Sequence, residues 1–282
     1  MKRRLTRAEP VQGVSEAAPN GLLIVNADDW GRDAHTTGCI LDCVVRQAVS
    51  SVSAMVFMEH SDRAAAIALE RNIDAGLHLN FTSPFTAGAC PPGLAERQRQ
   101  IAVYLRRHRL AQLVFNPALV KSFEYVAAAQ VDEYRRLYGA DPVRLDGHHH
   151  MHLCANVLLG GLLPPGTLVR RNFSFQAGEK SLLNRSYRGV VDRLLARRHR
   201  LADYLFALAP FDPPGRLQRI VALAREHVVE VETHPVQPDE YRFLAGGEIF
   251  RLTGDLRIAP PRPPTGAPSG DRLRLVKRSA EN

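Results

Sequence analysis

The sequence has few cysteines and no long apolar run. None of its four cysteines, Cys39, Cys43, Cys90 and Cys154, forms a CxxC pair, so we expect neither a disulfide framework nor a cysteine zinc site. Cys39 and Cys43 are one helical turn apart, which is the spacing of two residues packed on one helix face. No stretch approaches about 20 apolar residues, so no membrane span is predicted. No apolar run precedes Gly21, so no secretory signal is expected, and a reduced, cytoplasmic location is predicted.

Aromatic residues are also scarce, at 7% of the chain with a single tryptophan, whereas the net charge is +8. A nucleic-acid-binding surface would interleave basic residues with exposed aromatics or lie on a known binding module, and neither is visible. The basic residues instead form short runs at the chain ends and on presumed helix faces, so we predict solvated surface charge and no nucleic-acid partner. With 282 residues, 45% of them hydrophobic, the chain can bury a substantial core.

Apolar runs alternate with helical periodicity along most of the chain. We predict a flexible extension over 1–20, one catalytic-type domain over 21–257 and a disordered, Pro-rich and charged tail over 258–282. Strands are expected at 22–25, 51–58, 73–80, 143–145, 167–170 and 228–232, with helices at 37–48, 62–71, 118–138 and 217–226. The basic segment 174–209 is expected to be mostly helical or irregular. Strands that alternate with helices predict an α/β fold with a parallel sheet and right-handed crossovers.

The run Asp146-Gly147-His148-His149-His150-Met151-His152 holds four of the chain's 11 histidines. Neutral imidazole is the commonest protein metal ligand, and a nearby carboxylate orients it. If the preceding strand continues, Asp146, His148, His150 and His152 share one face and His149 takes the other. These four positions on one face would span roughly 20 Å at about 3.3 Å per residue, so one metal cannot use all of them.

Polar side chains follow four predicted strands at the point where each one ends. Asp28 and Asp29, His78 with Asn80, the histidine run, and His234 occupy these positions. Each has a structural explanation when taken singly: a helix cap, a hydrogen-bonded core histidine, or the end of a strand. The carboxyl ends of parallel strands meet at one rim, however, so the four groups are expected to be neighbours in space. Together they predict a metal site.

Four ordered motifs carry a resemblance to a known family. They are Asn26-Ala27-Asp28-Asp29-Trp30-Gly31, Gly76-Leu77-His78-Leu79-Asn80, Leu145-Asp146-Gly147-His148-His149-His150-Met151-His152 and Thr233-His234-Pro235. Over about residues 21 to 250 the chain resembles the YdjC-like carbohydrate deacetylases, which include chitooligosaccharide deacetylases and a hopanoid-associated branch. The resemblance implies a distorted (β/α) barrel of the glycoside hydrolase/deacetylase type. It also implies a hydrolase that removes N-acetyl groups from amino sugars, oligosaccharides or glycoconjugates with a divalent metal.

The resemblance also assigns roles by position. Asp29, His78 and His148 are expected to ligate the metal, Asp28 to act as the catalytic base and His234 as the acid. An Asp-His-His shell leaves coordination positions for water and a substrate carbonyl, as a hydrolytic metal requires. The donor set suits Mg²⁺ or Zn²⁺, and also Mn²⁺, Co²⁺ or Ni²⁺. The expected partner is an acetylated amino sugar, and the oligomeric state, with a homodimer as one option, is left open.

Five further residues are candidates for substrate contacts or for positioning the ligands: Asp146, His150, His152, Asn80 and Trp30. The chain departs from the family pattern at Trp30, where phenylalanine is usual, at Thr37 in place of an asparagine, and at Val236 in place of a glycine. These differences bear on substrate range.

Two alternatives stay open. One is another barrel-type metallohydrolase, such as a phosphoesterase or cyclic-amide hydrolase, which the spare histidines would suit if it used more metals. The other is a carbohydrate-binding relative without turnover. Arg170 and Arg171 follow a predicted strand, where they either contact substrate or serve the structure.

Overall fold

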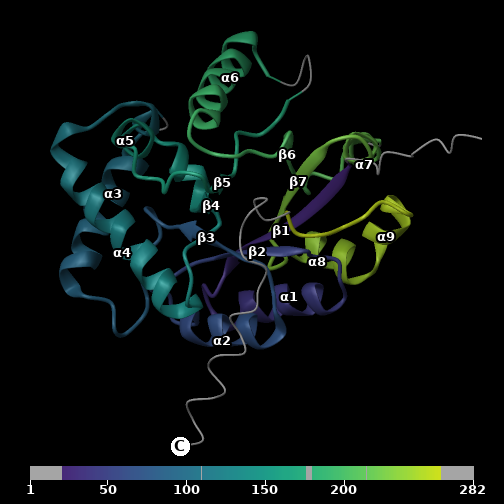
Figure 1. Ribbon diagram of the computed structural model, residues 1–282, viewed down its shortest axis with the longest axis horizontal. Coiled ribbons are helices and arrows are strands. Elements are labelled where there is room, and N and C mark those ends of the chain that lie inside the picture. The colour runs from purple at the N-terminus through teal and green to yellow at the C-terminus, as the bar shows by residue number, and fades with distance from the viewer. Residues whose placement is uncertain (1–20, 109, 176–179, 214, 262–282) are drawn as a thin grey trace, which may run out of the picture.

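The structure, a computed structural model, describes residues 21–108, 110–175, 180–213 and 215–261. The predicted extension 1–20 and residues 262–282 of the predicted tail lie outside the described residues. Within the described part, parallel strands form one sheet in the order β5-β4-β3-β2-β1-β7-β6 (Figure 1). The strands are β1 (Leu22–Trp30), β2 (Ser51–Ala54), β3 (Ala75–Leu79), β4 (Arg144–Gly147), β5 (Leu168–Val169), β6 (Tyr204–Ala207) and β7 (Val228–Thr233). The sheet curls into a half-barrel, which confirms the predicted fold class.

Helices surround the outside of this curled sheet, as Figure 1 shows. For example, α1 contacts β1, α4 contacts β3 and α7 contacts β7. The helices are α1 (Ala34–Val45), α2 (Ser61–Arg71), α3 (Pro92–Arg107), α4 (Val120–Tyr138), α5 (Ala155–Gly160), α6 (Leu182–Ala196), α7 (Arg216–Ala224), α8 (Pro238–Ala245) and α9 (Glu248–Thr253). No helix in the described ranges is both long and apolar enough to cross a bilayer.

The two faces of the sheet differ in polarity because side chains alternate along each strand. The outer face joins the helices in the hydrophobic core; its buried side chains include Leu23, Val25, Ala27, Val52, Ala54, Leu77, Leu79, Leu145, Val169, Val229 and Val231. The inner face is polar, and its buried side chains include Asn26, Asp28, Ser51, Ser53, His78, Arg144, Asp146, Glu230 and Glu232. The concave side of the sheet therefore holds a buried polar network at its centre.

A small apolar cluster closes this interior at the amino end of β1. Leu22 and Ile24 of β1 form a separate buried cluster with Ala259. The amide of Leu23 donates to the Arg257 carbonyl at 3.2 Å, and the amide of Ala259 donates to the Leu23 carbonyl at 3.1 Å. The residues that follow Arg257 thus pair with β1, although the disordered tail was predicted to begin at residue 258.

The histidine run departs from the predicted strand. Strand β4 ends at Gly147, and His148–Leu153 forms 3-10 turns in which His149 and His150 have left-handed φ values of 55° and 57°. Gly147 permits this turn because a Cβ there would lie 2.9 Å from the His152 nitrogen. The strand alternation expected for the run is therefore wrong, since the chain folds back over the end of β4.

Strand β6 lies in the segment that was predicted to be mostly helical or irregular. It pairs with β7 alone at one edge of the sheet. Its four residues follow a helix and a run of arginines, so the short apolar pattern Tyr204–Ala207 gave a weak strand signal. The amide of Ser174 donates to the Leu205 carbonyl at 2.8 Å, which links the chain after β5 to this edge.

Candidate metal and catalytic site

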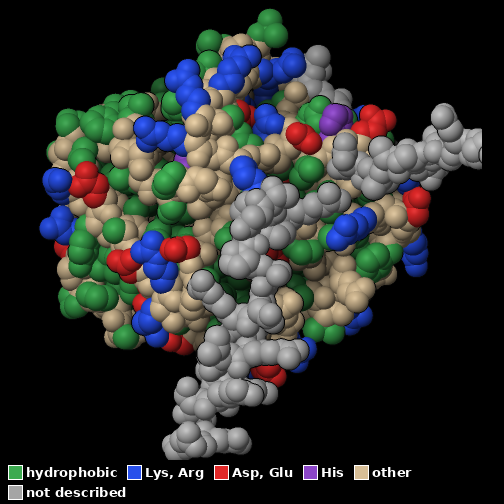
Figure 2. Space-filling view, in the orientation of Figure 1, with side chains coloured by type: hydrophobic (Ala, Val, Ile, Leu, Met, Phe, Trp, Pro, Cys, Tyr) green, Lys and Arg blue, Asp and Glu red, His purple; other side chains and the backbone are tan. Residues whose placement is uncertain are grey.

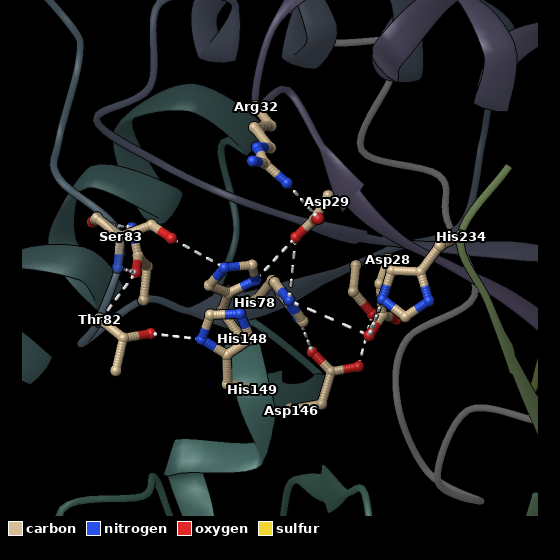
Figure 3. Close-up of polar contacts among 12 residues, drawn as sticks. Asp28, Asp29, Arg32, His78, Thr82, Ser83, Asp146, His148, His149 and His234 are labelled. Atoms are coloured by element: carbon tan, nitrogen blue, oxygen red, sulfur yellow. Dashed lines mark hydrogen bonds and ion pairs between the residues drawn. The ribbon is translucent and has the colours of Figure 1, made fainter. Parts of the chain in front are cut away.

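Three predicted ligands meet at the carboxyl ends of β1, β3 and β4. His148 Nδ1 lies 2.9 Å from Asp29 Oδ1, and His78 Nε2 lies 3.5 Å from the same oxygen. All three residues are buried, and Figure 3 shows the two rings pointing toward the Asp29 carboxylate. Asp29 reaches this position with a left-handed φ of 69°, at the irregularity where β1 loses register with β2.

The chemistry of this trio fits a cation. Asp29 Oδ1 is buried and accepts no hydrogen bond of normal geometry, although two imidazole nitrogens lie within 3.5 Å. Burial opposes ionisation of Asp29, but His148 and His78 together hold the pKa of its carboxyl far below the usual range. One carboxylate oxygen and two ring nitrogens, all within 4.8 Å of one another, are thus free to face a common ion.

Neighbouring side chains fix the orientation of each ligand. Asp146 Oδ1 lies 2.7 Å from His78 Nδ1, which leaves Nε2 to face Asp29. Ser83 Oγ lies 2.9 Å from His148 Nε2, which leaves Nδ1 to face Asp29. Arg32 Nη1 donates to the second oxygen of Asp29 at 3.1 Å. A carboxylate behind a ligand histidine is the common arrangement that sets its tautomer and raises its basicity.

Asp28 is held by Arg170, a residue whose role the sequence left open. Arg170 Nη1 and Nη2 donate to the two oxygens of Asp28 at 2.7 Å each. The same guanidinium contacts Asp146 at 2.8 Å, Glu230 at 2.7 Å and Glu232 at 3.1 Å. Burial opposes its charge, but these carboxylates raise the pKa of Arg170 well above its ordinary value. The Arg170 side chain is buried, so its role is to hold these carboxylates in place.

His234 borders the open side of the site. Its side chain is 34% exposed, and its Nε2 lies 4.0 Å from Asp28 Oδ2 and 4.0 Å from Glu232 Oε1. The backbone amide of His234 donates to Glu240 Oε2 of α8 at 2.7 Å, which anchors the turn after β7. His234 is therefore a partly exposed imidazole beside the buried Asp28.

The sequence profile of a family described as "YdjC-like protein" matches residues 22–248. The chain belongs to the YdjC-like family. The "Carbohydrate deacetylase" of Mus musculus is 28% identical over 147 residues, which cover 50% of this chain and 46% of the mouse protein. The "Chitooligosaccharide deacetylase" of Yersinia pestis (strain Pestoides F) is 27% identical over 139 residues, covering 48% of this chain and 52% of that protein.

This YdjC-like chain spans about half the length of the curated relatives it matches. A solved structure from Enterococcus faecalis V583, described as a putative cellobiose-phosphate cleavage protein, superposes with a TM-score of 0.62 at 16% identity. The superposition covers 85% of this chain and 97% of that one. At this identity the likeness establishes a shared fold.

The remaining predicted site residues take different places in the YdjC-like chain. His150 Nε2 lies 3.1 Å from Glu232 Oε2, and its ring packs edge-on against Phe173. His150 also lines a pocket of about 350 Å³ between the histidine run and α6, together with His149, Asn172, Phe173, Tyr187 and Arg188. Of the five supporting candidates, His150 thus borders open space next to the site.

Three of the supporting candidates are enclosed. Asn80 accepts hydrogen bonds from the amides of Thr82 and Ser83 and thereby shapes the loop that carries Ser83. His152 is buried, with Nε2 2.9 Å from the Arg170 carbonyl. Trp30 is fully buried in the hydrophobic core. Asn80 and His152 hold backbone in place around the site, and Trp30 presents no surface to a substrate.

Glu230 and Glu232 of β7 were missed as site residues. They alternate with valines in a strand that was predicted to be buried in a parallel sheet. Burying acidic side chains costs free energy unless they are paired. Acidic residues at alternate positions of such a strand therefore indicate a polar interior. Arg32, Ser53 and Ser83 carried no comparable signal.

The polar interior has an excess of negative charge. Its buried carboxylates are Asp28, Asp29, Asp146, Glu230 and Glu232, and its buried guanidiniums are Arg144 and Arg170. Five acids against two arginines leave a charge of −3 if all ionise and every imidazole is neutral. Burial opposes a charge on His78, but Asp146 and Asp28 raise the pKa of its imidazole to about 10, and a proton there would leave −2. Burial raises the pKa of Glu230, which favours the neutral form of this side chain and so reduces the excess of negative charge. A divalent cation beside Asp29 would neutralise much of what remains.

Proposed function

We propose that this chain is a divalent-metal-dependent hydrolase that removes an N-acetyl group from an acetylated amino sugar, oligosaccharide or glycoconjugate. The observation that carries the proposal is the buried Asp29 Oδ1, which accepts no hydrogen bond of normal geometry and faces one nitrogen each of His78 and His148, at 3.5 and 2.9 Å. The names of the relatives, carbohydrate deacetylase and chitooligosaccharide deacetylase, supply the substrate class.

Asp29, His78 and His148 would hold the cation, with Mg²⁺ or Zn²⁺ as the leading candidates. A divalent ion with open positions polarises an acyl carbonyl and lowers the pKa of water toward about 7. Asp146, Ser83 and Arg32 keep the three donor atoms aimed at a common point, so the site is preorganised.

In this proposal Asp28 accepts the proton of the attacking water. Its Oδ2 lies 4.0 Å from His78 Nε2, on the His234 side of the trio. The bidentate contact with Arg170 fixes the plane of the carboxylate, so its orientation does not depend on substrate. A general base must lie within reach of the proton that it removes, and the contact with Arg170 would keep Asp28 in one position for this step.

In this proposal His234 protonates the departing amine. An amine leaves poorly unless it is protonated as the C–N bond breaks, and imidazole titrates in the range that such a step needs. His234 is partly exposed and lies beside Asp28 and Glu232, which is what supports this role.

The side-chain pairing favours a single-metal hydrolase over a multi-metal phosphoesterase. Asp28, Glu232 and His234 form a second group with ligand atoms within 4.8 Å of one another. Arg170 already binds both oxygens of Asp28 and one oxygen of Glu232. Displacing a buried guanidinium is costly, so this group is poorly suited to a second cation.

The test measures acetate released by the full chain, loaded with Mg²⁺ or Zn²⁺, from a panel of N-acetylated amino sugars and oligosaccharides. We expect acetate from at least one, and we expect Asp28→Asn to retain the metal but lose activity by about 10²-fold or more. Phosphate release from phosphate esters with no acetate from the panel would support the phosphoesterase alternative. Saccharide binding with no turnover of any substrate would support the non-catalytic alternative.

A further inference from the structure

Helix α6 carries an apolar stripe that the described part of the chain leaves exposed over much of its surface. Leu183, Tyr187, Val190 and Leu194 are 81%, 40%, 60% and 39% exposed. Their spacing of four, three and four residues places them on one face of the helix. A neighbouring face of the helix packs on the protein through Val191, Asp192 and Leu195, which are buried. In Figure 1, α6 stands out from the body at the top of the view.

The same segment carries most of the net charge of the chain. Residues 180–200 contain seven lysines and arginines and one acid, Asp192, so their net charge is +6 of the total of +8. Asp192 is buried and bonds Arg171 at 2.8 Å, so it faces inward. Figure 2 shows blue Lys and Arg side chains gathered on this projection, with green hydrophobic side chains at its end.

We propose that the outer face of α6 docks on an anionic lipid surface. An amphipathic helix with leucine and valine on one face and flanking arginines lies in the headgroup boundary, where apolar side chains enter and cations meet phosphates. A second copy of this chain is a poor occupant, because two segments of net charge +6 would repel each other. A nucleic acid would meet the charge but leave the apolar stripe without a partner.

The location of α6 ties this surface to the site. Asn184, Tyr187 and Arg188 of α6 line the pocket of about 350 Å³ that also contains His149 and His150. A chain docked through α6 would therefore hold this pocket next to the membrane. The docking rests on the exposed face alone and holds whether or not the proposed deacetylase chemistry is correct.

The test is co-sedimentation of the full chain with vesicles of phosphatidylcholine, with and without about one-third phosphatidylglycerol. One variant, Leu183→Gln with Val190→Gln, removes the apolar stripe. A second, Arg193→Gln with Arg197→Gln, removes two exposed charges. A matched control, Val103→Gln with Lys121→Gln, alters an apolar residue and a charge of similar exposure on α3 and α4, at 61% for Val103 and 85% for the Lys121 side chain.

We expect binding to the anionic vesicles that weakens with salt, and little binding to the neutral ones. The arginine variant should lose roughly fivefold in partition coefficient for each charge removed. The apolar variant should lose at least about tenfold, and the control should bind like the parent chain. The proposal is overturned if the chain binds neither vesicle, or if both α6 variants bind as the parent does. It is also overturned if sedimentation velocity shows a dimer that the apolar variant dissociates.

Discussion

Arg170 donates two hydrogen bonds of 2.7 Å to Asp28, one to each carboxylate oxygen. The contact joins the end of β5 to the end of β1, across the interior of the half-barrel. Arg170 also touches Asp146, which in turn orients His78. One buried guanidinium therefore positions the proposed base and, through Asp146, one proposed metal ligand.

Arg170→Lys should reduce kcat by at least about tenfold, because an ammonium keeps the charge but cannot hold both Asp28 oxygens in one plane. Metal content should fall less than kcat, since Asp29, His78 and His148 are unchanged and only Asp146, behind His78, loses part of its contact with Arg170. Steady-state kinetics and elemental analysis of the same preparation check both expectations. Full activity in the lysine variant would show that the bidentate contact is dispensable.

Asp146→Asn should weaken cation binding by about 10- to 100-fold, because the variant loses the carboxylate that orients His78 and increases its basicity. Arg170 would also lose one of its charged partners. The measurement is a calorimetric titration of the metal-stripped chain. Ser53→Ala is the matched control: it removes the 2.5 Å hydrogen bond to Asp146 and leaves the charge, so a smaller loss is expected. Equal affinities in parent and Asp146→Asn chains would contradict this role.

His152 should make the fold less stable as pH falls below about 6.5. Burial lowers the pKa of this imidazole to about 3, whereas an unfolded chain has a histidine pKa near 6.5. Between those values the unfolded state binds more protons, so the free energy of unfolding rises with pH, by about 1.4 kcal/mol per pH unit for one full proton. Below pH 3 both states are protonated and the slope from this group ends.

Urea unfolding of metal-stripped parent and His152→Gln chains between pH 4.5 and 7.5 isolates this contribution, because the other titrating groups are common to both. The parent should lose more stability across this range than the variant. Parallel pH profiles would show that His152 is not the group responsible.

Gly147→Ala should destabilise the fold and disturb the histidine run, because the new Cβ would lie 2.9 Å from the backbone nitrogen of His152. Gly38→Ala is the control: it lies inside α1, its Cβ would meet nothing within 4 Å, and it should stabilise by roughly 0.5–1 kcal/mol. Thermal unfolding of both variants measures the contrast. A Gly147→Ala chain as stable as the parent would mean that the turn after β4 relaxes easily.

The proposed ligands could be predicted from the sequence because of one topological rule. Parallel strands bring their carboxyl ends to one rim, so the polar groups after four strands were expected to be neighbours. The resemblance to the YdjC-like family then singled out Asp29, His78 and His148 among them. The apolar run that marked β1 is a fully buried strand, which leaves a clear sequence signal.

Other parts of the site depend on contacts between distant residues. The fold-back of His148–Leu153 requires a close approach at Gly147 that no periodicity encodes. Arg170 looks like any arginine after a strand until four carboxylates surround it. Strand β6 is an edge strand of four residues next to a strongly basic segment, so local pattern alone was too weak to predict it.

The most direct test of this account is a calorimetric titration of the metal-stripped chain with Zn²⁺, compared with the Asp29→Ala variant. The account predicts one high-affinity site per chain in the parent and a loss of at least about 100-fold in affinity when Asp29 is removed. Unchanged affinity in Asp29→Ala, or two equivalent sites in the parent, would contradict a single cation held by Asp29, His78 and His148.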